Sequence, residues 1–264
     1  TLKFYRFLTD ETGVYAKLRK STGIDNPVKL IGFELGNEVY HDVGDKLYNP
    51  DGSITSSLVI DYSDSKPFEY DTERLLTTKE VSERYADVAL PHILAVKEYA
   101  PEAEFFPVLV NNDSAADGMV WNRVIASKLG KYVNAGVLHI YYGVSLSTHK
   151  SENDLMDNIK QIFREEAGYA KDFKFAITEH SLYSSGQEIS YTSLRGIVSD
   201  SMFMCNYLNR GDILLATYHN FYGTTNWSYL LDIDGEYVGS NISKLYGLYK
   251  EKLGNSCFPI SLYT

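Results

Sequence analysis

The sequence predicts an α/β protein built around a parallel β-sheet, and three observations lead to this expectation. Short apolar, β-branched runs alternate along the chain with longer segments of helical periodicity. The short runs are almost continuously apolar, as in parallel strands that are covered on both faces. The length of 264 residues, with 44% hydrophobic and 23% charged residues, suits one large folded domain. We place this domain at residues 1–253, followed by a C-terminal segment at 254–264.

Five short segments are predicted strands. They are residues 28–33, 104–110, 137–142, 173–178 and 213–218. Segments of helical length separate them, and parallel strands need crossover connections of this kind. The sequence therefore predicts that the five strands run parallel.

Five segments with apolar residues at helical spacing are predicted helices. They are residues 11–21, 77–100, 151–168, 191–208 and 242–253. The helix at 77–100 has the best-defined start, because Thr77 and Glu80 form a capping-box pattern. Pro91 lies inside that segment and predicts a kink or a division into two shorter helices.

A long connection follows residue 38 and ends near Thr77. It contains the turn residues Asn49, Pro50, Asp51 and Gly52 and one short strand-like run at 57–62. Connections this long inside compact domains are usually functional or mobile. A loop over an active-site cleft and a tolerated surface insertion are equal interpretations.

Composition excludes several classes of partner. The formal charge of −10 and a pI near 5.1 argue against nucleic acid and anionic membranes, which need clustered Lys and Arg. No apolar run approaches the roughly 18–20 residues of a membrane span. A neutral polysaccharide remains compatible, and the 22 Tyr residues could stack on sugar rings or simply occupy element boundaries.

Cysteine and histidine positions predict neither a disulfide framework nor a metal or cofactor site. The two cysteines, Cys205 and Cys257, fit no metal motif. Cys205 follows three apolar residues in a predicted helix, so we expect a buried free thiol. The histidines show no ligand spacing with nearby acids, and the sequence has no phosphate-binding loop or Gly-x-Ser-x-Gly elbow.

Two acidic residues follow predicted strands in a pattern that indicates catalysis. Glu38 comes after the first strand, within Glu34-Leu35-Gly36-Asn37-Glu38, and Glu179 comes directly after the fourth. Such a residue can also simply favour the positive end of a helix. However, cleavage of a glycosidic bond with retention needs two carboxyl groups, one protonated to release the leaving oxygen and one ionised to attack. The pair therefore predicts Glu38 as general acid/base and Glu179 as nucleophile.

These motifs resemble the clan A, or "4/7", retaining glycoside hydrolases, and family 51 α-L-arabinofuranosidases most closely. The segment ending in Asn37-Glu38 is similar to the acid/base segment of that family. The segment His139-Ile140-Tyr141-Tyr142-Gly143 is similar to its sixth-strand motif. Thr178-Glu179-His180 matches the nucleophile segment, except that the usual Asp-Glu-Trp has become Thr-Glu-His.

The resemblance implies roles for further residues. Asn37 would bind the sugar 2-hydroxyl, and Tyr141 would orient Glu179, since a phenol that donates to a carboxylate keeps it ionised. His139 would belong to the substrate site or would be a core or rim histidine without a catalytic task.

Aromatic and polar residues near the later strands extend the predicted substrate site. Tyr183 would stack on a sugar, and His219 and Trp227 would lie near the same rim. His180, where the family has Trp, leaves the substrate open.

The resemblance also implies a (β/α)8 TIM barrel in which Glu38 ends strand four and Glu179 ends strand seven. The five predicted strands would then be strands four to eight, and the first three would lie on another polypeptide, in a longer protein or in an associating copy. We therefore expect this chain alone to have weak or no hydrolase activity. The segment 254–264 could begin an accessory β-sandwich.

The leading functional hypothesis is a retaining glycoside hydrolase that acts on a polysaccharide or oligosaccharide through a covalent glycosyl-enzyme. Alternatives are another clan A activity, such as a uronidase, xylosidase or agarase, and a non-catalytic carbohydrate-binding protein derived from a hydrolase. A secreted or periplasmic location is slightly favoured.

Overall fold

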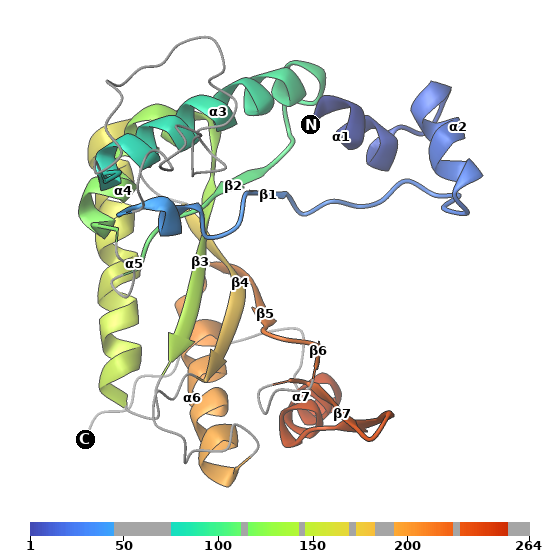
Figure 1. Cartoon of the computed structure of the whole chain (residues 1–264), viewed down its shortest axis with the longest axis vertical. Coiled ribbons are helices and arrows are strands. Elements are labelled where there is room, and N and C mark those ends of the chain that lie inside the picture. Colours follow the sequence, from blue (N-terminus) through green and yellow to red (C-terminus); the bar gives the residue numbers. More distant parts are fainter. Residues whose placement is uncertain are drawn as a thin grey trace, which may run out of the picture. The chain divides into compact units, whose positions relative to one another are not determined.

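The computed structural model describes residues 1–44, 75–111, 116–142, 146–168, 173–182, 193–223 and 228–252. The chain divides into two compact units (Figure 1). The first unit contains Thr1–Gly136 and Gln161–Lys171, and the second contains Val137–Lys160 and Asp172–Thr264.

The first unit combines a two-stranded parallel sheet with helices. Its elements are α1 (Leu2–Thr9), α2 (Gly13–Ser21), β1 (Phe33–Leu35), the 3-10 helix η1 (Val39–Asp42), α3 (Thr78–Tyr99), β2 (Phe105–Pro107), α4 (Gly118–Leu129) and the 3-10 helix η2 (Gly130–Tyr132). Phe33 lies opposite Phe105 in the sheet, and their rings stack with centroids 5.8 Å apart. This stacking joins the two short strands on one face.

Buried polar side chains complete the hydrogen bonding of this unit. Tyr85 of α3 donates to the Leu35 carbonyl at 2.7 Å and accepts from the Val108 amide at 2.9 Å. Trp121 of α4 donates to the Val108 carbonyl at 2.9 Å. Because buried backbone groups need partners, these side chains tie both helices to the strands.

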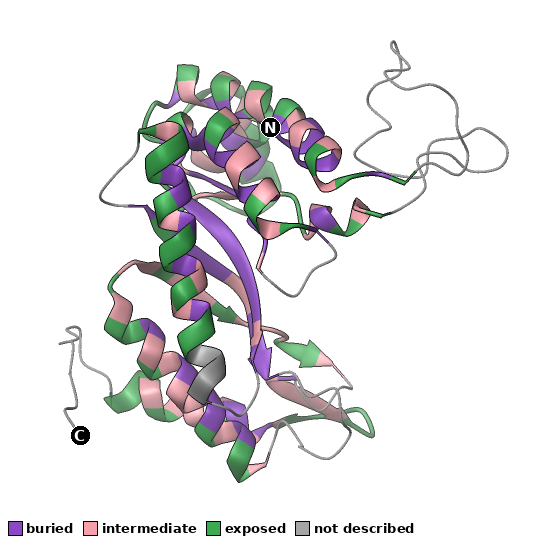
Figure 2. Cartoon of the chain, turned by 90° about the vertical axis from the view of Figure 1, so that its left-hand side faces the viewer, coloured by how far each residue is buried: buried purple, intermediate pink, exposed green. Residues whose placement is uncertain are grey.

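The second unit is organised around a three-stranded sheet. Its elements are β3 (Ala135–Tyr142), α5 (Leu146–Ala167), β4 (Lys174–Leu182), α6 (Leu194–Arg210), β5 (Ile213–Tyr218), β6 (Tyr222–Gly223), β7 (Leu230–Ile233), β8 (Glu236–Gly239) and α7 (Asn241–Lys252); β3 and α5 extend a few residues into the first unit. The strand order is β3-β4-β5, and β4 and β5 are parallel. The long helices carry buried and exposed residues in alternating stripes (Figure 2), as expected for amphipathic helices on a core.

Most of the predicted elements are present with shifted ends. The predicted strands at 137–142 and 213–218 correspond to β3 and β5, and the strand at 104–110 is shortened to β2. The strand at 173–178 is longer than predicted, because β4 continues through Glu179 to Leu182. Glu179 therefore lies within a strand instead of after it.

The prediction of a strand at 28–33 is wrong for all but its last residue. The chain enters β1 only at Phe33, and Ile31 is 61% exposed. The Val28 amide donates to the Leu8 carbonyl of α1 at 2.8 Å, so its hydrogen bond is not available to a sheet. An apolar run predicts burial, but a strand also needs a hydrogen-bonded neighbour.

The helix predictions are confirmed with one correction. Thr77 caps α3 with the reciprocal bonds of the capping box, the Glu80 amide to Thr77 Oγ1 and the Thr77 amide to Glu80 Oε2. Pro91 lies inside one continuous helix, so of the two expectations, a kink or two shorter helices, the division into two helices is wrong. The helices α1 and α4 and the strands β6 to β8 were not predicted.

The cysteine prediction is also corrected. Cys205 is a free thiol, but its side chain is exposed. Its neighbours Phe203 and Tyr207 occupy the buried side of α6, and helical spacing turns residue 205 away from that side.

Within the described residues, the strands form three sheets in place of the single parallel sheet that was expected. They are β1-β2, β3-β4-β5 and a small mixed sheet, β6-β7-β8. The mixed α/β class is confirmed, and the pairs β1-β2 and β4-β5 are parallel as predicted. Both features are consistent with part of a TIM-barrel-like fold. None of the described helices combines the length and apolar character that a membrane crossing requires.

Candidate active site

Polar side chains from β3 and from the residue after β5 lie around the carboxylate of Glu179, which is on β4. Tyr141 of β3 donates from its hydroxyl to Glu179 Oε2 at 2.5 Å. His139 Nδ1, from the same strand, and His219 Nδ1, just after β5, lie 3.5 and 3.7 Å from the same oxygen. The Glu179 side chain is 22% exposed, so the carboxylate is held from one side and open to solvent on another.

Alternation along β3 explains why both His139 and Tyr141 reach this carboxylate. Residues two apart on a strand point to the same face of the sheet. The residue between them, Ile140, and the next, Tyr142, are buried on the other face or in the core. The His-x-Tyr spacing therefore places an imidazole and a phenol together at Glu179.

A bulge in β4 sets the direction of Glu179. Ile177 pairs with Ala216 and His180 pairs with Tyr218, so β4 has one residue more than β5 across this interval. Bulges of this kind re-aim side chains and occur next to active sites. Thr217 donates from its hydroxyl to the Thr178 carbonyl and holds the bulged segment against β5. Sequence reasoning placed the strand end here because it could not detect the bulge.

His180 points into the core, away from solvent. Its side chain is fully buried between Phe203, with ring centroids 4.8 Å apart, and Tyr246, whose hydroxyl lies 3.3 Å from Nε2. Burial lowers the pKa of His180 to about 3, so the ring is neutral at ordinary pH. The histidine that stands at position 180, where the resembled family has Trp, is therefore a core residue.

Asp200 lies beside His180 in the same core. Its Oδ1 is 3.9 Å from His180 Nδ1 and accepts a short hydrogen bond from Tyr142. Burial raises the pKa of Asp200 to about 6, although the Tyr142 hydroxyl opposes this shift. The sequence contained no signal for this buried acid.

In the first unit, Glu38 has an uncommon backbone conformation. It follows Gly36, whose φ is +90°, and its own φ is +47° in the left-handed region. A residue other than Gly there costs of order 1 kcal/mol, and such residues cluster at functional sites. Tyr40 donates to Glu38 Oε1 at 3.3 Å, and His41 Nε2 lies 3.1 Å from Oε2. Sequence reasoning missed Tyr40 and His41, although they stand only two and three residues after Glu38.

The other predicted site residues divide into those that are described and those that are not. Asn37 is exposed next to Glu38. Tyr183, Trp227, most of the connection between Glu38 and Thr77, and the segment 254–264 lie outside the described residues. Gly44 and Leu76, which flank that connection, are joined by a 2.8 Å backbone hydrogen bond.

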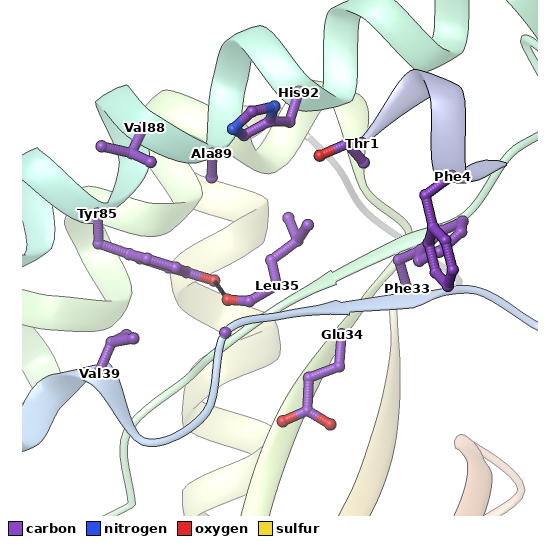
Figure 3. A pocket seen from close by; sticks show the side chains of 11 residues that line it. Thr1, Phe4, Phe33, Glu34, Leu35, Val39, Tyr85, Val88, Ala89 and His92 are labelled. Atoms are coloured by element: carbon purple, nitrogen blue, oxygen red, sulfur yellow. Dashed lines mark hydrogen bonds between the residues drawn. The ribbon is translucent and has the colours of Figure 1, made fainter. Parts of the chain in front are cut away.

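A cavity of about 360 Å³ lies in the first unit beside the segment that carries Glu38 (Figure 3). It is bounded by α1, β1 and α3. Its lining comprises Thr1, Phe4, Phe33, Glu34, Leu35, Gly36, Val39, Tyr85, Val88, Ala89 and His92. Figure 3 shows that the Glu34 carboxylate points away from α3, while Leu35 and Tyr85 meet at a hydrogen bond. The lining is largely apolar and includes the neighbours of the Asn37-Glu38 pair.

The arrangement around Glu179 suits an ionised carboxylate that reacts or binds through one open side. A phenol that donates to a carboxylate stabilises its charged form and fixes its orientation. Imidazole and carboxylate are also metal ligands. In the described residues, the short bond from Tyr141 fixes the direction of Oε2.

The fold and the site thus define a mixed α/β protein with an oriented acidic residue on a parallel sheet. Neither the scan of protein-family models nor the search of curated proteins finds a match to this sequence. Solved structures do match. AbfB, a family 51 α-L-arabinofuranosidase from Bifidobacterium longum, is 13% identical with a TM-score of 0.63, over 94% of this chain and 49% of its own.

A second solved structure gives the same result. The thermostable GH51 α-L-arabinofuranosidase from Thermotoga petrophila RKU-1 is 15% identical with a TM-score of 0.59, over 94% of this chain and 45% of its own. The chain therefore spans about half the length of the solved structures it matches. At these identities the likeness shows the fold, which is glycosidase-like.

Proposed function

We propose that this chain carries the catalytic carboxyl groups of a retaining glycoside hydrolase. Glu179 acts as the nucleophile and attacks the anomeric carbon, and Glu38 protonates the leaving oxygen. A glycosyl ester on Glu179 results, and Glu38 then activates the water that hydrolyses it, so two inversions give net retention. The substrate is an oligosaccharide or polysaccharide.

The observation that carries the proposal is the 2.5 Å hydrogen bond from Tyr141 to Glu179 Oε2. A nucleophilic carboxylate must be ionised and aimed, and a phenol donor supports both. The bulge at Thr178-Glu179 further supports a role that requires a defined direction.

The role of Glu38 is supported by its local structure. The left-handed backbone conformation of Glu38 costs free energy. A surface residue without a function would have no reason to adopt it. Tyr40 donates to one of the Glu38 oxygens and His41 Nε2 lies 3.1 Å from the other, so the carboxyl group is held in a defined direction. Asn37, directly before it and exposed, would bind the sugar 2-hydroxyl.

We propose an α-L-arabinofuranoside as the first substrate to test. The three motifs resemble family 51, and both solved structures above are named as α-L-arabinofuranosidases. His219, Tyr183 and Trp227 would contribute to sugar binding.

The test is hydrolysis of a panel of dinitrophenyl glycosides, with the anomer of the first-formed sugar identified by proton NMR. Dinitrophenolate leaves with little protonation, so even weak turnover is measurable. We expect release of the retained anomer from one member, and we expect Glu179→Ala to abolish it. Release of the inverted anomer, or undiminished turnover by Glu179→Ala, would contradict the proposal.

The remaining candidate is a non-catalytic carbohydrate-binding protein. It predicts saturable oligosaccharide binding that survives Glu38→Gln, together with no turnover on any member of the panel. The same experiment with a binding titration therefore separates the two candidates.

A further inference from the structure

Thr178 stands where the resembled family has an acidic residue, and its side chain contacts the ring beside Glu179. Its Oγ1 lies 3.2 Å from Nε2 of His139. The other ring nitrogen, Nδ1, lies 3.5 Å from Glu179 Oε2. One imidazole thus connects the hydroxyl of residue 178 with the carboxylate of residue 179.

A neutral imidazole has one nitrogen that donates and one that accepts, so the partner of one nitrogen decides the state of the other. A threonine hydroxyl can donate to an unprotonated Nε2. The ring proton then resides on Nδ1, the nitrogen that faces Glu179. A carboxylate at position 178 would instead accept from Nε2–H and would favour the opposite tautomer or the charged ring.

We propose that Thr178 is a positioning residue that holds His139 neutral with its proton on Nδ1. The positive end of the ring dipole then faces the Glu179 carboxylate and supplements the hydrogen bond from Tyr141. In the opposite tautomer a nitrogen lone pair would face the carboxylate and repel it. The His139 side chain is only 3% exposed, so this difference acts in a medium that screens it weakly.

The bulge in β4 makes this arrangement possible. Neighbouring residues on a regular strand point to opposite faces. The extra residue between Ile177 and His180 lets Thr178 and Glu179 both reach His139. The Thr217 hydroxyl donates to the Thr178 carbonyl in this bulged segment.

The test is nitrogen-15 NMR of the histidine rings of the full chain near pH 7, with His139 assigned by the loss of its signals in His139→Gln. We expect wild-type His139 to be the neutral Nδ1–H tautomer. Thr178→Val keeps the size and removes the hydroxyl, so we expect the population to move toward Nε2–H. Thr178→Ser restores the hydroxyl and should restore the Nδ1–H tautomer.

Two results would overturn the proposal. One is a wild-type His139 that is Nε2–H or doubly protonated, and the other is a tautomer that Thr178→Val does not change. If Thr178→Val fails to fold, the wild-type spectrum and Thr178→Ser still decide between the tautomers.

The catalytic consequence rests on the proposed function. With a dinitrophenyl glycoside, we expect Thr178→Val to lower kcat about tenfold with little change in KM, and Thr178→Ser to recover most of the loss. An equal kcat in wild type and Thr178→Val would show that the tautomer does not serve catalysis. Absence of turnover in the wild type itself would concern the proposed function alone, because the NMR experiment tests the tautomer without turnover.

Discussion

The hydroxyl of Tyr141 donates a 2.5 Å hydrogen bond to Oε2 of Glu179, from the strand next to the one that carries the glutamate. The neighbouring tyrosine, Tyr142, is fully buried and bonds Asp200 instead. Two adjacent tyrosine hydroxyls therefore donate to two different carboxyl groups. Replacing each tyrosine by Phe gives two variants that can be compared directly.

Replacing Tyr141 by Phe removes the donor to Glu179 and keeps the ring. We expect kcat on the best aryl glycoside to fall by roughly 10- to 100-fold, because the carboxylate loses charge stabilisation and orientation. Thermal stability should change little, since a single partly exposed hydrogen bond contributes about 1 kcal/mol.

Tyr142→Phe is the control for that variant. It leaves Asp200 buried with one partner fewer, so we expect a lower free energy of unfolding, by about 1–3 kcal/mol, and a nearly unchanged kcat. Steady-state kinetics and urea unfolding of both variants make the comparison. A kcat that falls equally in the two variants would contradict a specific role for Tyr141.

Glu38→Ala separates acid catalysis from nucleophilic attack. Dinitrophenolate needs little protonation to leave, whereas poorer leaving groups need a general acid, whose contribution is about 10²- to 10⁴-fold. We therefore expect glycosylation by poor leaving groups to be lost selectively. Added azide should rescue the variant by attacking the glycosyl-enzyme, and the product should be the glycosyl azide of retained configuration. A uniform loss for all leaving groups, without azide rescue, would remove Glu38 from the acid/base role.

The buried pair of Asp200 and His180 predicts opposing contributions to stability as the pH falls. With a folded pKa of about 6, Asp200 takes up a proton between pH 6 and 4 in the folded chain but not in the unfolded one, which favours folding at lower pH. His180 has a folded pKa of about 3, so below about pH 6.5 the unfolded chain binds the proton first, which favours unfolding. The two effects offset each other between pH 6 and 4.

Replacing one of these two residues should reveal the pH dependence of stability that the other contributes. For Asp200→Asn we expect the free energy of unfolding to fall more steeply from pH 6 to 4 than in the wild type, by up to about 1.4 kcal/mol per pH unit. For His180→Asn we expect the opposite change of slope. Urea unfolding at four pH values between 4 and 7 provides the measurement, and parallel curves for all three proteins would refute the assignment.

Replacing two glycines by alanine compares a tightly packed position with an open one. A Cβ on Gly130, at the end of α4, would lie 2.5 Å from the Ala167 Cβ and close to Phe163. Gly130→Ala should therefore destabilise the chain by about 1–3 kcal/mol, since overpacking forces neighbours to move. A Cβ on Gly247, inside α7, meets nothing within 4 Å, so Gly247→Ala should stabilise by up to about 1 kcal/mol. Thermal unfolding compares them, and similar shifts of Tm in both variants would contradict the packing around Gly130.

The sequence predicted correctly those helices and strands whose ends depend on local residues and not on pairing with distant strands. Continuous apolar runs identified β3 and β5, and Thr77 with Glu80 identified the start of α3. The extent of β4 could not be predicted, because Thr178-Glu179-His180 has the composition of a strand end, and only pairing with β5 through a bulge extends it. The strand predicted at 28–33 was wrong because its first amide donates to α1 and not to a neighbouring strand.

The residues around Glu179 were partly predictable from the sequence. Glu179, Tyr141 and His139 were identified from motifs, and the structure brings them together with His219. The contacts of Tyr40 and His41 with Glu38, and of Thr178 with His139, were missed because hydrogen bonds between side chains leave no periodic signal in the sequence. The burial of His180 depends on α6 and α7, which lie far from it in the chain.

The most direct measurement is covalent labelling with an activated 2-fluoro glycoside, followed by peptide mapping. The fluorine slows hydrolysis of the glycosyl-enzyme, and the activated leaving group lets labelling depend on the nucleophile alone. We expect one sugar per chain, on Glu179, with no label in Glu179→Ala and retained labelling in Glu38→Gln. A label on any other residue, or a labelled Glu179→Ala variant, would contradict Glu179 as the nucleophile.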